Sequence, residues 1–413
     1  MFRRPPCVLL LSILLFHAAW ATSHAQEWTR FRGPNGSGVG RMKRPPITWS
    51  EDDYKWKVTL PGVGHSSPVL WGGKLFVTSG DEQSGARYVL GLDAESGREL
   101  WRREFPAAHH GKHKLNSFAS PTPTVDAARV YVAWGAPEQL IVLALDHQGE
   151  EQWRVDLGPF KSGHGFGVSL ILHDGLLIVP NEQQGDSSLV ALEADSGKLR
   201  WRVPRDSKVA YSTPCLLPRE GGHDLIFTTW EYGVSGHDPQ TGAMRWQADL
   251  FDKSHVETSI GSPITAGGLV LGLSGWLGHG EQLIAVRVDE ENGEPKPREV
   301  YRIERGAPLC TTPLVVGDLL FLWADEGVVT CADAQTGEVH WRRRVGGTYY
   351  SSPIAVGGCV YNLSVDGEVV VLAASTEFKE LARNDLGESS HATPAVADGV
   401  MYLRTFTQLF ALE

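Results

Sequence analysis

The nine-residue stretch Asp333-Ala-Gln-Thr336-Gly337-Glu-Val-His-Trp341 decides the fold, because versions of it return along the chain. The pattern Asp-x-x-Ser/Thr-Gly-x-x-x-Trp recurs with Gly97 and Trp101, with Gly197 and Trp201 (headed by Glu), and with Gly242 and Trp246. A copy shortened by one residue ends at Trp153. Self-similarity at a regular period indicates a repeat architecture, so the chain should be an array of similar units.

A second phrase, Ser or Thr followed by Pro and an apolar run, alternates with the first. It occurs at Ser67-Pro68, Ser120-Pro121 (echoed by Thr122-Pro123), Thr213-Pro214, Ser262-Pro263, Thr312-Pro313, Ser352-Pro353 and Thr393-Pro394. Ser169-Leu170 takes the corresponding place in a degenerate third copy. These eight starts, at a spacing of roughly 40 to 55 residues, predict eight repeats.

Each repeat shows the pattern of four short strands. Two apolar runs joined by a Gly-containing turn follow the Ser/Thr-Pro phrase, as in residues 68–78, and this is a hairpin signal. A third run ends at the Asp of the Trp phrase, the Ser/Thr-Gly pair makes the next turn, and Trp begins the fourth strand. Four antiparallel strands per repeat are typical of a propeller blade, so we predict an all-β, eight-bladed propeller.

The ends of the repeat region predict how the ring closes. The last repeat, residues 394–413, supplies only three strands, whereas residues 56–60 precede the first Ser-Pro phrase and carry Trp56 in register. We therefore expect this N-terminal strand to complete the C-terminal blade and remove the free sheet edges. In the fifth repeat, Glu294-Pro-Lys-Pro297 follows the turn, and we expect this insertion to push the last strand on to about Tyr301.

We interpret the Trp and Gly residues of the first phrase as structural. Gly permits the positive φ of the turn, and its missing Cβ lets a neighbouring indole lie flat on the backbone. Burying an indole removes roughly 150–250 Å² from water, which docks each blade to the next. The residues given this role are Trp56, Trp101, Trp153, Trp201, Trp246, Trp341, Gly97, Gly197, Gly242 and Gly337. A platform for stacking a quinone or carbohydrate is the alternative.

Residues 1–25 have the features of a secretory signal peptide. Two arginines precede an apolar stretch, Val8–Ala19, which is too short to span a bilayer comfortably. Ser23-His-Ala25 offers small residues before a cleavage site. We therefore expect a periplasmic or secreted protein without a membrane span, a monomer whose single propeller domain is residues 26–413.

Charge and motifs exclude several functions. The formal net charge of −11 should repel phosphate backbones, so we expect no nucleic-acid binding. Gly-x-Ser-x-Gly, Ser-x-x-Lys, His-Glu-x-x-His and phosphate-loop motifs do not occur in the sequence. Hydrolase and kinase functions therefore have no motif support.

The residue three positions before each Pro of the second phrase should face the mouth of the central channel, because the innermost strand of a blade lines that channel. The candidate ligand-binding residues at or near these places are His65, Phe118, His164, Tyr211, Tyr350 and His391, with Ile260 and Cys310 at the remaining ones. Such a ring suits a polar ligand or a metal. Alternatively, these side chains only fill and hydrogen-bond a narrow tunnel.

Two loops are further metal candidates, and the metal assignment stays open. Residues 109–113 contain three histidines, which could bind Zn²⁺ or Cu²⁺ or could form a surface loop. Asn181, Glu182 and Asp186 lie in a polar loop that could hold Ca²⁺, although turn chemistry also explains it.

The first phrase resembles the PQQ-enzyme repeat, Ala-x-Asp-x-x-Thr-Gly-x-x-x-Trp, which Cys331–Trp341 match from the Asp onward. The resemblance covers about residues 50–413. Two groups share this repeat: the pyrroloquinoline-quinone (PQQ) dehydrogenases of the periplasm, and the non-catalytic BamB-type propellers, which bind partner proteins during outer-membrane assembly. Residues 28–36, WTRFRGPNG, are similar to the start of a large group of exported bacterial PQQ-repeat-like proteins.

The resemblance implies an exported, non-catalytic scaffold that binds a protein partner or a small polar ligand. The alternative that it implies is an oxidoreductase with a degenerate site that uses PQQ and Ca²⁺. Many quinone dehydrogenases carry adjacent cysteines above the cofactor and bind Ca²⁺ through converging oxygen ligands. Here no two cysteines are adjacent, and no cluster matches those motifs. Because a fold alone does not confer chemistry, we expect no cofactor, with PQQ and Ca²⁺ as the alternative.

Overall fold

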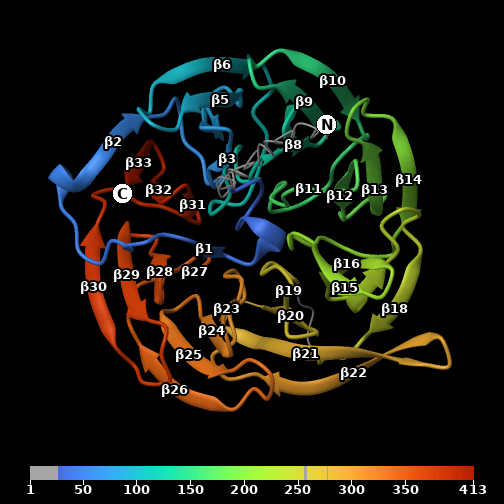
Figure 1. The fold of residues 1–413 in the computed structure, drawn as a ribbon. Helices are drawn as coiled ribbons and strands as arrows, with labels where there is room; N and C mark the ends of the chain where they lie inside the picture. Colours follow the sequence, from blue (N-terminus) through green and yellow to red (C-terminus); the bar gives the residue numbers. More distant parts are fainter. Residues whose placement is uncertain (1–26, 255–257, 277) are drawn as a thin grey trace, which may run out of the picture.

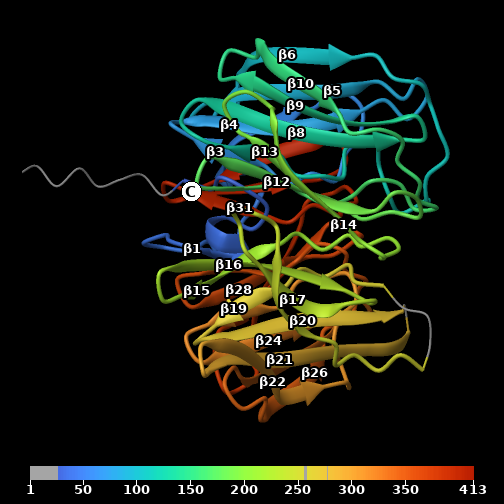
Figure 2. The same ribbon diagram turned by 90° about the vertical axis from the view of Figure 1, so that its right-hand side faces the viewer.

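The computed structural model describes residues 27–254, 258–276 and 278–413, so the expected signal peptide lies outside the described residues. Eight antiparallel sheets surround a central axis as the blades of a propeller, seen along the axis in Figure 1 and from the side in Figure 2. The predicted all-β, eight-bladed fold is therefore confirmed. In this described part, every helix is too short or too polar to cross a bilayer.

The first four blades use consecutive strands from the axis outward. Blade 1 contains β3 (Val69–Trp71), β4 (Lys74–Gly80), β5 (Arg87–Asp93) and β6 (Glu99–Phe105). Blade 2 contains β7 (Thr124–Val125), β8 (Arg129–Ala136), β9 (Gln139–Asp146) and β10 (Glu151–Asp156). Blade 3 contains β11 (Ile171–His173), β12 (Leu176–Asn181), β13 (Ser188–Glu193) and β14 (Leu199–Pro204). Blade 4 contains β15 (Cys215–Arg219), β16 (Gly222–Thr229), β17 (Gly233–His237) and β18 (Met244–Ala248).

The next three blades repeat this order, and the last blade departs from it. Blade 5 contains β19 (Ile264–Ala266), β20 (Leu269–Trp276), β21 (His279–Glu291) and β22 (Glu294–Ile303). Blade 6 contains β23 (Leu314–Val316), β24 (Leu319–Trp323), β25 (Val328–Asp333) and β26 (Val339–Arg344). Blade 7 contains β27 (Ile354–Val356), β28 (Cys359–Leu363), β29 (Glu368–Ala373) and β30 (Glu380–Asp385). Blade 8 contains β31 (Ala395–Ala397), β32 (Val400–Arg404) and β33 (Gln408–Leu412).

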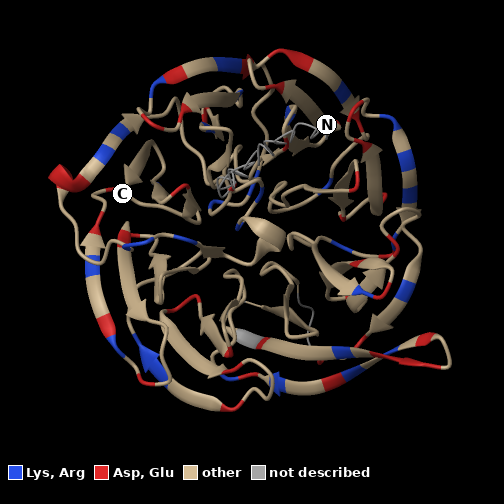
Figure 3. Cartoon of the chain, in the orientation of Figure 1, with Lys and Arg blue, Asp and Glu red and all other residues tan. Residues whose placement is uncertain are grey.

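The N-terminal strand closes the ring as predicted. β2 (Tyr54–Thr59) is the outermost strand of blade 8, and it pairs antiparallel with β33, with Trp56 opposite Ala411. The chain reaches this position from the axis through two short 3₁₀ helices, η1 (Pro34–Gly36) and η2 (Glu51–Asp53), and through β1 (Val39–Gly40). β1 adds a parallel fifth strand to the inner edge of blade 7. Figure 3 shows acidic and basic residues interspersed along the outer strands.

The insertion in blade 5 lengthens a hairpin, so the last strand begins at Glu294 and not near Tyr301, but Tyr301 does take the place of the motif Trp. β21 and β22 pair continuously out to Glu291 and Glu294. Between them lies the turn Asn292-Gly293, with φ of 55° and 80°. Positive φ at both central residues suits the right-handed twist of a two-residue hairpin. The paired strands therefore continue into the tip, which projects beyond the ring in Figure 1.

An indole docks most blades onto the next one. Trp153 of blade 2 donates from Nε1 to the carbonyl oxygen of Ala194 in blade 3 at 3.0 Å. A Cβ added at Gly197 would lie 2.7 Å from Cε3 of Trp153, so the indole needs glycine there. The same arrangement places Trp56 over Gly97, Trp101 over Gly149 and Trp201 over Gly242, and places Tyr301 over Gly337. The hydrophobic core lies mainly between blades for this reason.

Two junctions are built differently. Trp246 donates to Oδ2 of Asp224 in its own blade at 2.7 Å, and Gly293 in the next blade has nothing within 4 Å of its ideal Cβ. Trp341 donates to the carbonyl oxygen of Ser375 at 3.0 Å and packs against the ring of Phe378. The extended hairpin moves Gly293 away from the ring, which removes the glycine that Trp246 would otherwise cover.

Candidate functional site

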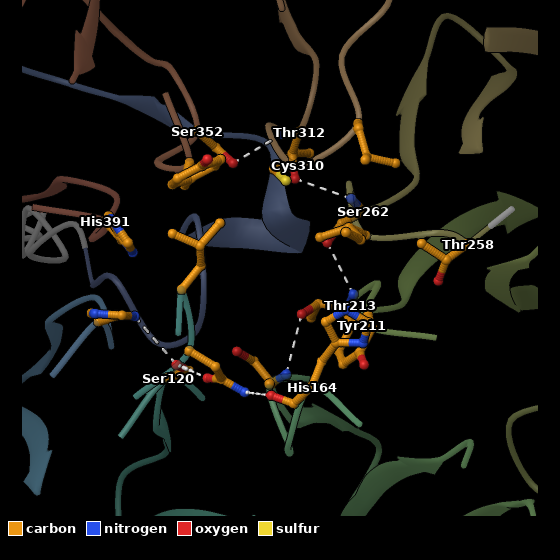
Figure 4. A pocket seen from close by; sticks show the side chains of 18 of the residues that line it. Ser120, His164, Tyr211, Thr213, Thr258, Ser262, Cys310, Thr312, Ser352 and His391 are labelled. Atoms are coloured by element: carbon orange, nitrogen blue, oxygen red, sulfur yellow. Dashed lines mark hydrogen bonds between the residues drawn. The ribbon is translucent and has the colours of Figure 1, made fainter. Parts of the chain in front are cut away.

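One hydroxyl side chain from each blade surrounds the central axis. These eight buried residues form the hydroxyl ring: Ser67, Thr122, Ser169, Thr213, Ser262, Thr312, Ser352 and Thr393. From Ser67 to Ser352, the backbone N–H of each residue donates to the hydroxyl of the next, over distances of 2.9 to 3.3 Å. Figure 4 shows part of this chain of hydrogen bonds. The second sequence phrase therefore supplies contacts between blades as well as the start of each inner strand.

The hydroxyl ring has one break. Its seven hydrogen bonds among the described residues run from Ser67 in blade 1 around to Thr393 in blade 8. The Ser67 hydroxyl, at the seam between blades 8 and 1, has no hydrogen-bond partner among the described residues. The break coincides with the place where the N-terminal strand closes the circle. The seam is thus held by strand β2 rather than by the ring.

A cavity of about 610 Å³ opens on one side of the hydroxyl ring. Its walls contain the predicted residues His65, His164, Tyr211, Tyr350 and His391, together with Ile260 and Cys310. Figure 4 shows His164, Tyr211, Cys310 and His391 around the cavity. The rings of His65 and His391 are 4.3 Å apart between centroids, and those of Tyr350 and His391 are 5.0 Å apart. Most of the residues three positions before a Pro of the second phrase therefore do form one collar of side chains. We call this collar the mouth.

Phe118 does not face this cavity, contrary to expectation. In blade 2 the ring position belongs to Thr122, so the place three before Pro123 is Ser120, which lines the cavity. Phe118 is buried instead under the guanidinium of Arg87, whose carbon lies 4.1 Å from the ring centroid. The doubled sequence Ser-Pro-Thr-Pro shifted the register by two residues.

Burial shifts two of the titratable groups that line the mouth, His391 and Cys310, toward their neutral forms. Burial lowers the pKa of His391 to about 4, and burial with the nearby His391, Arg404 and Lys112 charges lowers that of His65. Burial also raises the pKa of the Cys310 thiol well above its ordinary value, which disfavours the nucleophilic thiolate. Behind it, burial raises the pKa of Asp325 to about 6.

The opposite side of the hydroxyl ring is closed by residues 28–36, which we call the plug. Arg30 donates to the carbonyl oxygen of Pro214 at 2.6 Å. Arg32 donates to those of Pro313 and Pro353 at 2.8 and 3.0 Å. The helix η1 lies at the centre of the ring in Figure 1. The prolines of the repeat phrase thus supply the acceptors that hold the plug in place.

Two further plug side chains complete this closure. Asn35 both donates to and accepts from the backbone of Leu216, at 2.9 and 2.8 Å. Trp28 is fully buried and its backbone bridges to Leu70.

Burial lowers the pKa of Arg30 to about 10, and burial together with the Arg30 charge lowers the pKa of Arg32 to about 9. Both guanidiniums are still cationic at pH 7. The sequence did not lead us to predict the plug, although Arg30 and Arg32 stand close together in it.

The two loops proposed as metal candidates have other contacts. Glu182 forms a buried ion pair with Arg205 at 3.1 Å and accepts a hydrogen bond from Ser207 at 3.1 Å. The rings of His109 and His110 pack edge-on against Phe118. Among the residues that the structure describes, no group of three or more His, Cys, Asp or Glu side chains is placed to hold a metal ion.

A family model described as outer membrane protein assembly factor BamB matches residues 49–141, 137–296 and 282–413. The BamB of Moranella endobia is 26% identical over 271 residues, which span 62% of this chain and 65% of that protein. A polyvinylalcohol dehydrogenase of a Pseudomonas species is 28% identical over 192 residues, 41% of this chain and 28% of the enzyme. Each of these two matches spans less than two thirds of the relative. The BamB of Yersinia pestis is 20% identical over 359 residues, 84% of this chain and 74% of that protein.

Solved structures show the same fold. The crystal structure of BamB from Moraxella catarrhalis superposes with a TM-score of 0.63 at 15% identity, covering 87% of this chain and 98% of that one. The quinohemoprotein alcohol dehydrogenase of Comamonas testosteroni also gives 0.63, at 14% identity, covering 94% and 80%. At such identities the likeness concerns the fold alone, so the side chains of the site must decide between binding and catalysis.

Proposed function

The chain belongs to the family described as outer membrane protein assembly factor BamB, and from this we propose that it is an exported, non-catalytic propeller that binds a protein partner. Two of the relatives above carry that name. An assembly factor acts by binding other proteins, and a periplasmic location goes with this role. The proposal extends both properties to this chain.

The observation that carries the proposal is the chemistry of the mouth. A general base works best with a pKa near the operating pH, whereas burial lowers the pKa of His391 to about 4. The Cys310 thiol, with its raised pKa, is a poor nucleophile. Asp325 has a pKa of about 6, but its carboxylate accepts the backbone N–H groups of Leu309 and Cys310. This collar is therefore suited to contact rather than to proton transfer.

The face that carries the mouth is the surface we assign to the partner. Trp276 lines the cavity and is 47% exposed. Nearby blade 4 carries Trp230, with the ammonium groups of Lys208 and Lys253 at 5.7 and 5.9 Å from its ring. Aromatic residues are enriched at protein interfaces, and loops at one end of a rigid scaffold commonly carry function.

Site-specific photocrosslinking in the exporting cell tests this proposal. A photoreactive residue replaces Trp276 at the mouth or, as a matched control, the 56% exposed Leu199 on the outer strand of blade 3. We expect a discrete adduct with one protein from position 276 and not from position 199. The absence of any adduct at 276, or the same adducts at both positions, would overturn the assignment.

The alternative is an oxidoreductase that uses PQQ and Ca²⁺, favoured by the likeness to a polyvinylalcohol dehydrogenase over part of the chain. The residues present do not fit the Ca²⁺ ion of this pair. Ca²⁺ takes several oxygen ligands, commonly carboxylates, and the described cavity lining contains neither Asp nor Glu. The four cysteines in the described ranges are free thiols, so no adjacent-cysteine disulfide covers the cavity.

Titration of the purified protein with PQQ, with and without Ca²⁺, decides between the two functions. Tryptophan fluorescence and quinone absorbance report binding. Saturable Ca²⁺-dependent binding at about micromolar Kd, roughly −8 kcal/mol, would replace the scaffold with an enzyme. The lack of binding at about millimolar PQQ, roughly −4 kcal/mol, would retire the dehydrogenase.

A further inference from the structure

Among the described residues, three buried arginines near the hydroxyl ring form no direct ion pair with a carboxylate, although the Glu388 charge acts on Arg404. The plug residues Arg30 and Arg32 and the blade 8 residue Arg404 are fully or almost fully buried. Their hydrogen bonds go to carbonyl and hydroxyl oxygens, including that of Ser66, which Arg404 contacts. The Nε atom of each guanidinium has no partner among the described residues. Burying a cation is costly unless an opposite charge or enough hydrogen bonds compensate it.

The hydroxyl groups of the ring line the cavity beside this charge. A hydroxyl group has one donor and two acceptor sites, and seven hydroxyls of the ring use an acceptor site for a backbone N–H. Within the described ranges, the donor of each ring hydroxyl has no protein acceptor. An N–H bond to a hydroxyl oxygen also polarises its O–H and strengthens it as a donor. O–H donors that line a cavity next to cations can bind an oxyanion.

We propose that the cavity binds a small organic oxyanion, with its carboxylate or phosphate group at the hydroxyl ring and its apolar body between the walls of the mouth. A volume of about 610 Å³ falls within the roughly 300–1,000 Å³ typical of small-molecule sites. Leu115, Ile260 and Tyr211 supply apolar and aromatic wall surface, and the described lining has no carboxylate to repel an anion. This site does not depend on the proposed partner binding.

The position of the ring relative to the plug supports this assignment. Thr213, Thr312 and Ser352 of the ring each precede a proline whose carbonyl oxygen accepts from a plug arginine. The hydroxyls therefore lie one residue away from the guanidinium contacts, on the cavity side. Coulomb energies are several times larger at such partly desolvated sites than in water. The ring would contact the oxyanion directly, and the arginines would act on it through their charge.

Calorimetric titration of the purified protein tests the site with defined probes. The probes are benzene-1,3,5-tricarboxylate, phenyl phosphate and the neutral benzene-1,3,5-tricarboxamide. We expect at least one anion to bind at least tenfold more tightly than the tricarboxamide. The stronger of the two anions identifies the preferred oxyanion. Equal or absent binding of both anions relative to the tricarboxamide would overturn the proposal.

A matched pair of variants places the anion at the ring. Thr312→Asp and Thr312→Asn both keep an oxygen that can accept the Ser262 N–H, now bonded at 3.1 Å, but only Asp adds a negative charge. We expect the better anion to bind at least tenfold more weakly to the Asp variant than to the Asn variant. Equal affinities would remove the anion from the ring. If either variant fails to fold, the same pair at Ser262, which accepts from Thr213 at 2.9 Å, gives the comparison.

The two proposals fail separately. Anion binding uses purified protein and small molecules alone, whereas the partner is detected by crosslinking at Trp276 in cells. A protein that binds the tricarboxylate but yields no specific adduct would keep the anion site and lose the partner. The reverse result would keep the partner and lose the anion site.

Discussion

The two sides of the hydroxyl ring are built on different principles. On the plug side, Trp28 and Arg32 are fully buried, and backbone oxygen atoms accept from the plug arginines. On the mouth side, aromatic rings such as those of His391 and Tyr350 contact one another edge to face, and Trp276 is half exposed. Both sides surround the same axis and use residues next to the same Ser/Thr-Pro phrase.

From this difference we expect the plug side to contribute mainly to stability and the mouth side mainly to recognition. Buried groups that hold fixed hydrogen bonds cannot change without leaving unpaired partners, so the plug side should be intolerant of substitution. The Tyr350 ring contacts His391 edge to face, and a contact of this kind can change at a smaller cost. We therefore expect the plug to determine whether the channel is closed and the mouth to determine what enters it.

The largest effect should come from Gly33→Ala in the plug. Gly33 has φ of 64°, and a Cβ there would lie 2.6 Å from Cε3 of Trp28. We expect a loss of about 2–5 kcal/mol in the free energy of unfolding, from backbone strain and overpacking together. The control is Gly387→Ala on the mouth side, where φ is 75° but no atom lies within 4 Å. Denaturant titration of both variants measures the difference, and equal losses would contradict the comparison.

A smaller loss should follow Arg32→Met. The change leaves the carbonyl oxygens of Pro313 and Pro353 without their donor. Each unpaired acceptor costs about 1–3 kcal/mol, partly offset because a buried cation is removed, so we expect a net loss of about 2–3 kcal/mol. Arg44→Met makes the same change at an exposed site and should stay within about 0.5 kcal/mol. If both variants unfold at the same denaturant concentration, the plug contributes no special stability.

The mouth should carry a pH response that the plug lacks. Burial lowers the folded-state pKa of His391 to about 4, so between pH 6.5 and 4 the unfolded chain binds the proton first. As the pH falls through this window, the wild type should lose about 3 kcal/mol of stability relative to His391→Gln. Denaturant midpoints measured at several pH values test this expectation. The Arg32→Met difference should stay constant there, because the pKa of Arg32 is about 9.

The smallest effect should come from Tyr350→Phe at the mouth. The ring remains beside His391, at the present centroid distance of 5.0 Å, and only the hydroxyl is lost. We expect the free energy of unfolding to change by less than about 0.5 kcal/mol. Calorimetric melting of the variant checks this. A loss comparable to that of Arg32→Met would mean that the mouth is as rigidly bonded as the plug.

Most of the fold was predictable because its signals are local. A Gly turn, an apolar run and a Trp recur in each blade, and the three-stranded last repeat indicated closure by the strand that contains Trp56. Most residues of the mouth were predicted by taking the residue three positions before each Pro of the Ser/Thr-Pro phrase. That choice misplaced Phe118 because two Ser/Thr-Pro pairs stand side by side, and only the paired blades show that Thr122 belongs to the ring.

The sequence by itself determined the eight blades, the closing strand and the family, since strand alternation and turn chemistry depend on neighbouring residues. Only the tertiary structure decided the plug, the hydroxyl ring and the extended hairpin of blade 5. Arg32 is separated by 281 and 321 residues from the two prolines that it contacts. No local pattern encodes such a contact, because it exists only after the ring has closed and brought eight distant phrases around one axis.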